Sequence, residues 1–86
     1  MSNATARVAA WLIGVAMKLG GFPLSLSMRQ VCNGFERNGM TFPGTGCRME
    51  TVKASLQWLE ENGLLESTEG EKSGFGRRRR NYTFKG

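Results

Sequence analysis

Apolar residues recur at helical spacing in three segments of the chain. The first runs from Thr5 to Leu19, is rich in Ala, Leu, Met and Lys, and is followed by a glycine pair. Good helix formers followed by glycine predict a helix that stops at a left-handed residue. Its stripe Val8, Leu12, Val15 and Leu19 is predicted to face the core.

The second helical segment follows a short alternating stretch, Leu24 to Leu26, which predicts an edge strand because a proline precedes it. Ser27 opens the helix, and Gln30 stands three residues later, the spacing of a capping box. The predicted buried stripe consists of Met28, Val31, Cys32 and Phe35. We expect this helix to end near Asn38 and Gly39.

The third helix is predicted after a loop at 39–46, which is rich in glycine and threonine, with Thr45 as its cap. Its core seam consists of Met49, Val52, Leu56 and Leu59. Asn62 and Gly63, with Leu64 behind them, predict a Schellman stop. Trp58 is expected to pack against the core, and contact with a partner is the alternative.

Strand-like residues close the chain at Leu64–Thr68 and Asn81–Lys85, with a glycine-rich segment between them. This pattern predicts a hairpin whose returning arm carries Arg77 to Arg80. The predicted fold class is therefore α+β, with three helices, a small antiparallel sheet and a basic hairpin.

The length of 86 residues fits one domain, which we place at 5–86, and we interpret residues 1–4 as a cloning remnant. The first helix is apolar all round, so a core stripe leaves other apolar side chains uncovered. We expect a homodimer through Trp11, Ile13, Gly14 and Met17. The alternative is that this helix is simply central in the domain.

The net charge of +5 is concentrated at one end of the chain. Residues 1–71 hold six basic and seven acidic side chains, a balance of −1, whereas residues 72–86 hold six basic side chains and no acid. A basic segment on a nearly neutral body is typical of a polyanion-binding surface. The alternative is a solvated basic edge that discourages strand pairing.

Histidine is absent and there are two cysteines, so one copy of the chain can assemble neither a four-ligand zinc site nor a histidine-based catalytic arrangement. We predict no enzyme activity, no metal and no cofactor. Cys32 is expected to be a small buried hydrophobe, and Cys47 is either inert or a reactive thiol near a helix start. The longest apolar run, Val8 to Met17, is too short for a membrane span, and we expect a cytoplasmic, nucleoid-associated protein.

The order of these elements resembles the winged helix-turn-helix. Leu26 to Cys32 (LSMRQVC) is similar to the start of the scaffold helix of GntR-type regulators, and Thr51 to Leu65 (TVKASLQWLEENGLL) is similar to their recognition helix and its exit. The segment from Arg77 to Tyr82 also resembles the arginine-rich wing and last strand of phage and plasmid replication and regulatory proteins. The likeness spans about residues 5–85, although 10 or so more residues separate Phe35 from Val52 than in the GntR-type turn.

The resemblance implies double-stranded DNA as partner, with Arg29 on a phosphate, the start of the third helix in the major groove and the wing on the backbone or minor groove. The candidate DNA-binding residues are Arg29, Thr45, Arg48, Glu50, Thr51, Lys53, Gln57, Lys72, Arg77, Arg78, Arg79 and Arg80. Glu50 either accepts from a cytosine amino group or is an exposed carboxylate at a helix start.

We therefore expect a small dimeric transcriptional regulator, such as a repressor, or an accessory factor of a mobile element. One alternative is a winged helix used as a protein-interaction or inhibitor module. Another is a detached domain of a larger replication or transfer protein. Glu50, Glu60 and Glu61 favour the interaction module, because they weaken the third helix as a phosphate-binding surface.

Overall fold

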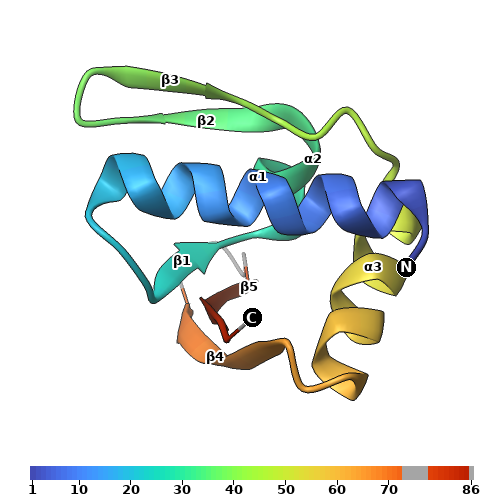
Figure 1. Cartoon of the computed structure of the whole chain (residues 1–86). Helices are drawn as coiled ribbons and strands as arrows, with labels where there is room; N and C mark the ends of the chain where they lie inside the picture. Colours follow the sequence, from blue (N-terminus) through green and yellow to red (C-terminus); the bar gives the residue numbers. More distant parts are fainter. Residues whose placement is uncertain (73–77, 86) are drawn as a thin grey trace.

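The computed structural model describes residues 1–72 and 78–85, which form a small α+β domain. In chain order, its elements are α1 (Asn3–Leu19), β1 (Leu24–Leu26), α2 (Met28–Asn33), β2 (Gly34–Arg37), β3 (Met40–Pro43), α3 (Met49–Glu61), β4 (Leu65–Lys72) and β5 (Arg78–Phe84). Helix α1 lies between two sheets, with the β2–β3 hairpin along one side and β1, β5 and β4 on the other (Figure 1).

Helix α1 begins two residues before the predicted Thr5, since Ser2 caps it. The Ser2 hydroxyl accepts from the backbone N–H of Thr5, which satisfies one of the free donors of the first turn. Gly20 adopts the predicted left-handed conformation, with φ of 91°, and its N–H donates to Ala16 O. The stop is thus explained by glycine at the position after the last helical turn.

Helix α2 has the predicted capping box and is much shorter than expected. Ser27 Oγ accepts from Gln30 N at 3.2 Å, and Gln30 Oε1 accepts from Ser27 N at 2.9 Å. The helix ends at Asn33 rather than near Asn38, because Gly34 takes φ of 91° and ψ of −179°, a conformation outside the helical region. Phe35, predicted on the helix stripe, lies in β2 instead.

The segment expected to be a helix end and a loop forms an antiparallel hairpin. Strand β2 pairs with β3 in a register that places Phe35 opposite Phe42, and both residues of the turn, Asn38 and Gly39, have positive φ, 54° and 74°. Asn-Gly with both angles positive is the chemistry of a type I′ turn, which matches the twist of the two strands. The prediction of a loop at 39–46 is therefore wrong for β3.

Helix α3 begins at Met49, and Arg48 occupies the cap position without a side-chain bond. The predicted cap Thr45 serves the loop instead, since its hydroxyl donates to Val31 O and accepts from Cys47 N. The Schellman stop is confirmed: the N–H groups of Gly63 and Leu64 donate to the carbonyls of Glu60 and Leu59. Of the predicted seam, Val52, Leu56 and Leu59 are buried, whereas Met49 is half exposed.

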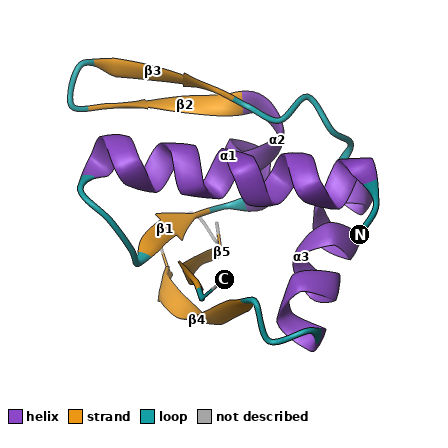
Figure 2. Cartoon of the chain, in the orientation of Figure 1, coloured by secondary structure: helices purple, strands orange, loops and turns teal. Residues whose placement is uncertain are grey.

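The three-stranded sheet has the order β1-β5-β4, with both pairs antiparallel. Strand β1 lies at the predicted edge. Strands β4 and β5 are longer than expected, because β4 continues to Lys72 and β5 starts at Arg78. Leu24, Leu26, Leu65 and Tyr82 of this sheet are buried in the core. The sheet lies below α1 and beside α3 (Figure 2).

The core is continuous across the three helices and both sheets, and its largest fully buried side chains come from α1, β1, α2 and α3. The predicted stripe of α1 is buried at Val8, Leu12 and Val15, with Leu19 half-buried. Cys32 is buried as expected, and burial raises the pKa of its thiol, as does the neighbouring Cys47 to a smaller extent. Trp58 is half-buried against the core, as predicted.

Candidate nucleic-acid interface

A groove of about 240 Å³ lies between α3 and the last strand, and we call it the α3–β5 groove. Its lining consists of Met28, Lys53, Leu56, Gln57, Glu60, Ser67, Arg80 and Tyr82. Three residues selected from the sequence, Lys53, Gln57 and Arg80, are thus brought together although they lie up to 27 positions apart. The other lining residues are not among those predicted from the sequence as members of the site.

Local geometry explains why these side chains converge. Lys53 and Gln57 are four residues apart, so they lie one above the other on the flank of α3 that faces the sheet. Arg80 and Tyr82 are two residues apart on β5 and therefore point to the same sheet face, which is the face that buries Tyr82 against the core. Arg80 is exposed at the rim of that face.

A chain of hydrogen bonds links the strand to the carboxyl-terminal half of α3. Arg80 Nη2 donates to Ser67 Oγ at 3.0 Å, and the Ser67 hydroxyl donates to Glu60 Oε1. Burial raises the pKa of the Tyr82 phenol below these groups; Arg80 opposes that shift and Glu60 adds to it. Glu60 is thus held by a hydrogen bond within the groove that Lys53 and Arg80 also line.

The outermost ridge of α3 is acidic and polar. Glu50, Ala54, Gln57 and Glu61 are exposed along it, and Gln57 Nε2 donates to Glu61 Oε1 at 3.1 Å. Glu50 and Thr51 also line a hollow against the start of α1, with Thr5 and Ser55 on its wall. These two predicted site residues therefore lie on the flank of α3 that faces α1, whereas Lys53 lies on the flank that faces Arg80 of β5.

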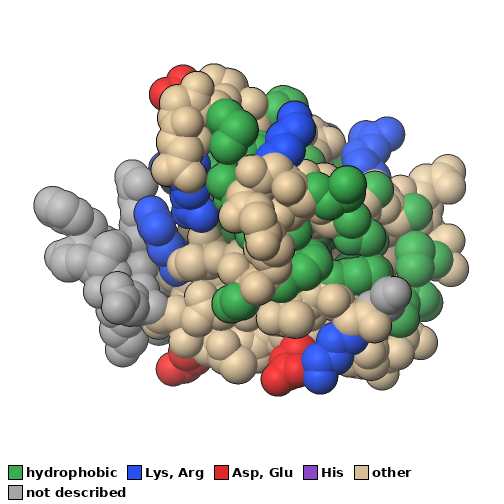
Figure 3. Space-filling view, turned by 60° about the vertical axis from the view of Figure 1, so that its left-hand side comes forward, with side chains coloured by type: hydrophobic (Ala, Val, Ile, Leu, Met, Phe, Trp, Pro, Cys, Tyr) green, Lys and Arg blue, Asp and Glu red, His purple; other side chains and the backbone are tan. Residues whose placement is uncertain are grey.

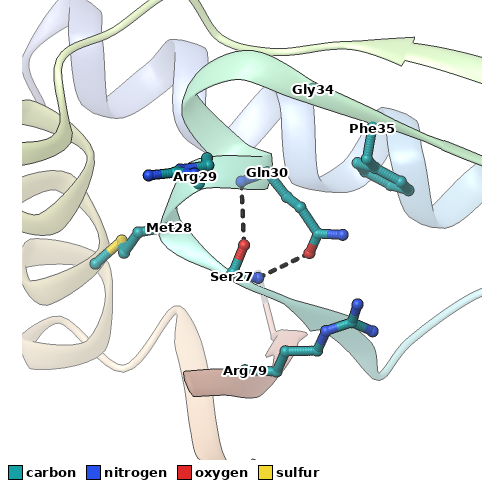
Figure 4. A pocket seen from close by; sticks show the side chains of 7 residues that line it. All are labelled: Ser27, Met28, Arg29, Gln30, Gly34, Phe35 and Arg79. Atoms are coloured by element: carbon teal, nitrogen blue, oxygen red, sulfur yellow. Dashed lines mark hydrogen bonds between the residues drawn. The ribbon is translucent and has the colours of Figure 1, made fainter. Parts of the chain in front are cut away.

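The remaining predicted residues of the helices have different positions. Arg29 is exposed on α2, and its guanidinium points past Met28, away from Arg79 (Figure 4). Arg48 is exposed at the start of α3. Thr45 is buried, and its hydroxyl is used twice within the loop, so the prediction that it faces a ligand is wrong.

The basic hairpin is only partly within the described residues. Lys72 and Arg78 are paired across β4 and β5, and Arg77 lies outside the described residues. Arg79 and Arg80 are both exposed, and because they are neighbours on one strand their side chains leave opposite faces of the sheet. Arg80 faces the α3–β5 groove, whereas Arg79 lines a second cavity beside α2 and β2.

The predicted dimer surface on α1 is partly covered by the chain's own hairpin. Trp11 is half-buried, its Nε1–H donates to Pro43 O at 2.7 Å, and its ring meets Phe35 edge-on. The prediction that Trp11 needs a partner chain to cover its ring is therefore wrong, because the β2–β3 hairpin, which was not predicted, covers it. Ile13 and Gly14 remain exposed, and Met17 is 79% exposed.

Exposed large apolar side chains lie in two places: Ile13, Met17 and Met40 on the second half of α1 and at the hairpin turn, and Met1 and Met49 at the starts of the chain and of α3. Figure 3, which brings the side of the hairpin turn forward, shows hydrophobic side chains at the surface among Lys and Arg side chains.

Among residues 1–72 and 78–85, no three His, Cys, Asp or Glu side chains are grouped so that they could hold a metal ion. In the same residues, no helix has both the length and the apolar character needed to cross a bilayer.

Comparison of the chain with models of protein families, with curated proteins and with solved structures finds no match. The proposal of a function therefore rests on the α+β fold and on the two cavities that Arg80 and Arg79 line.

Proposed function

We propose that the protein is a DNA-binding domain of the winged-helix class, with α3 directed to the major groove and the β4–β5 hairpin as its wing. The observation that carries the proposal is the α3–β5 groove, in which Lys53 and Gln57 of one helix and Arg80 of the last strand line one surface. Lysine, glutamine and arginine are the side chains that contact phosphates and base edges.

The arrangement of elements adds support. Helix α3 leads through a sharp turn into β4, and β5 returns between β4 and β1, so the hairpin lies directly beside α3. The order helix, strand, helix, helix, strand, strand is that of a winged helix, with β2 and β3 inserted between α2 and α3. Arg29 lines the neighbouring cavity, which adjoins the groove at Met28.

The test is selection of bound sequences from a random duplex library at two salt concentrations. Wild-type protein should enrich a sequence and lose affinity with a log-salt slope of roughly −4 to −5 per protomer if four or five basic groups neutralise phosphates. Lys53→Ala should change the preferred sequence. Arg80→Gln should weaken binding to all sequences alike and reduce the slope by about 1.

Lys85→Ala is the matched control, because Lys85 is an exposed lysine that pairs with Glu66 on the sheet, away from the groove. It should change neither affinity nor preference. Absence of duplex binding by the wild-type protein at low salt would refute the proposal, as would equal effects of Lys53→Ala and Lys85→Ala.

The acidic ridge of α3 supports a second candidate function, a protein-interaction module. Glu50 and Glu61 are exposed at the two ends of this ridge, and their negative charge opposes the approach of phosphate. Under this alternative, Glu50→Gln with Glu61→Gln would leave duplex binding absent. Under the DNA-binding proposal, the same double change should increase duplex affinity at low salt.

We also propose that the active form is a homodimer through the exposed face of α1. Ile13, Gly14 and Met17 remain on this face after the hairpin has covered Trp11. A cytoplasmic regulator of a mobile element, acting as a repressor or accessory factor, would bind a two-fold repeated site through such a dimer. The spacing of half-sites in the selected sequences would test the symmetry.

A further inference from the structure

A cavity of about 490 Å³ opens between α2, β2 and β5, and we call it the α2–β5 cavity. Its walls are the start of α2, Gly34 and Phe35 of β2, and Arg79 of β5. Arg79 leaves the sheet on the face opposite to Arg80, so this cavity and the α3–β5 groove lie on different sides of β5. The proposed DNA contact through α3 does not use it.

The capping box fixes a donor in the cavity wall. Because Gln30 Oε1 accepts from Ser27 N, the amide is oriented with its NH₂ group turned away from the helix start. Figure 4 shows this nitrogen and the guanidinium of Arg79 on the same side of the cavity, the side on which Phe35 lies. The lining thus presents an amide donor and a planar cation together.

A second cation stands beside the same wall. The guanidinium carbon of Arg37 lies 5.2 Å from the ring centre of Phe35, and Arg37 Nη2 donates to Ser25 O at 3.4 Å. Among the described residues that line the cavity, none is acidic. Glu66, on the outer face of β4, is paired with Lys85 at 2.5 Å, and Glu36 projects from the side of β2 opposite to Arg37.

We infer that the α2–β5 cavity binds a backbone phosphate of a second nucleic-acid segment, an inference that rests on the proposed function. Arg29 and Arg79 line the cavity, and no acidic side chain is among its described lining residues, so the site is positive. The flat guanidinium of Arg79 suits bidentate contact with phosphate oxygens. The Gln30 amide supplies a further donor to a third oxygen. A phosphate presents more acceptor oxygens than a carboxylate, and the cavity has room for it and part of its sugar.

The consequence is that one chain holds nucleic acid on both faces of its sheet. Arg80 and Lys53 line the groove on the α3 side. Arg79, Gln30 and Arg29 line the cavity on the outer side, and Arg37 stands next to it at Phe35. Successive arginines on β5 therefore divide between two sites. This gives a function to Arg79, which cannot share the face of the proposed DNA contact.

The test is a bridging assay with Arg79→Gln and its neighbour Arg80→Gln as a matched pair. A duplex is fixed to beads, protein is added, and a second, fluorescent duplex is offered. Wild-type protein should capture the second duplex. Arg79→Gln should keep binding to the first duplex within about twofold and reduce capture of the second by about tenfold or more, as expected when hydrogen bonds to a charged group are lost. Arg80→Gln should weaken binding to the first duplex.

Capture that survives in Arg79→Gln would overturn the inference, since bridging would then come from two α3 surfaces of a dimer. Binding of the first duplex without any capture by the wild-type protein would overturn it too. If the wild-type protein binds no duplex at all, the proposed function fails, and the second-segment inference fails with it.

The cavity itself is checked separately by titrating inorganic phosphate and following the ¹⁵N signal of the Gln30 side chain. A saturable shift that is absent in Arg79→Gln and present in Arg80→Gln supports the phosphate site, and identifies free phosphate as the ligand where no duplex binds. No shift, or an equal shift in both variants, overturns the site.

Discussion

Gly34 is the residue at which the hairpin depends most directly on backbone geometry. Its φ is 91°, and an added Cβ would lie 2.7 Å from Gly44 N, 2.9 Å from Pro43 C and closer still to Phe42 O. All three neighbours are backbone atoms, so no flexible side chain can move aside. Gly34→Ala would therefore displace the start of the hairpin from the end of α2.

The expected loss of stability follows from two contributions. A non-glycine residue in such a backbone conformation costs about 1 to 3 kcal/mol. Forcing apart packed atoms adds about 1 to 3 kcal/mol. The sum is about 4 kcal/mol, a large part of the stability of a domain this size. Since about 1 kcal/mol corresponds to roughly 4–8 °C, the melting temperature should fall by more than about 16 °C.

Gly39→Ala is the matched control on the same hairpin. Gly39 also has a positive φ, 74°, but an added Cβ there meets nothing within 4 Å. Its cost is limited to the conformational penalty, about 1 to 2 kcal/mol. Urea unfolding followed by circular dichroism measures both variants. Equal losses for Gly34→Ala and Gly39→Ala would refute the reasoning, because the contact with the neighbouring backbone would then have no effect.

Three further outcomes are expected. Trp11→Phe should lower the free energy of unfolding by at least about 1 kcal/mol in urea titrations, because a smaller aromatic ring replaces the indole and the hydrogen bond to Pro43 O is lost; an unchanged value would contradict that bond. Burial raises the pKa values of Cys32 and Tyr82 above their ordinary 9.0 and 10.0, so the folded state binds more protons and stability should fall as pH rises above about 9. Melting temperatures from pH 7 to 11 would check this, and Tyr82→Phe should make the fall above about pH 10 shallower. Met17→Glu should turn dimers into monomers in sedimentation without loss of folding, because Met17 is 79% exposed, and Arg7→Glu, also exposed on α1, should not; an unchanged mass for Met17→Glu would remove this face as the interface.

The ends of several helices could be predicted from the sequence, because interactions between neighbouring residues determine them. The capping box of Ser27 and Gln30, the glycine stop of α1 and the Schellman stop after α3 all involve residues within a few positions of each other. Such contacts form from nearby chain alone, so the sequence predicts them well. The edge strand β1 and the closing hairpin were predictable for the same reason, from alternation and glycine content.

The β2–β3 hairpin was missed because two local signals competed at one place. The spacing of Met28, Val31, Cys32 and Phe35 favoured a longer helix, while Asn38 and Gly39 carried the hairpin signal. Tertiary packing decided between them: Phe35 stacks on Phe42 at 4.9 Å and meets Trp11 edge-on, contacts that a helix through 35 would not make. The aromatic side chains on α1 and the hairpin thus cover one another.

The sequence by itself determined the α+β class, the three helices and the concentration of charge in the last 15 residues. Only the tertiary structure decided which of the selected residues share a surface. Pairing of β5 with β1 and β4 sends Arg80 toward Lys53 and Gln57 and sends Arg79 toward Gln30 and Phe35. The physical reason is that a strand alternates its side chains between two faces, and what lies on each face is fixed by contacts between segments far apart in the chain.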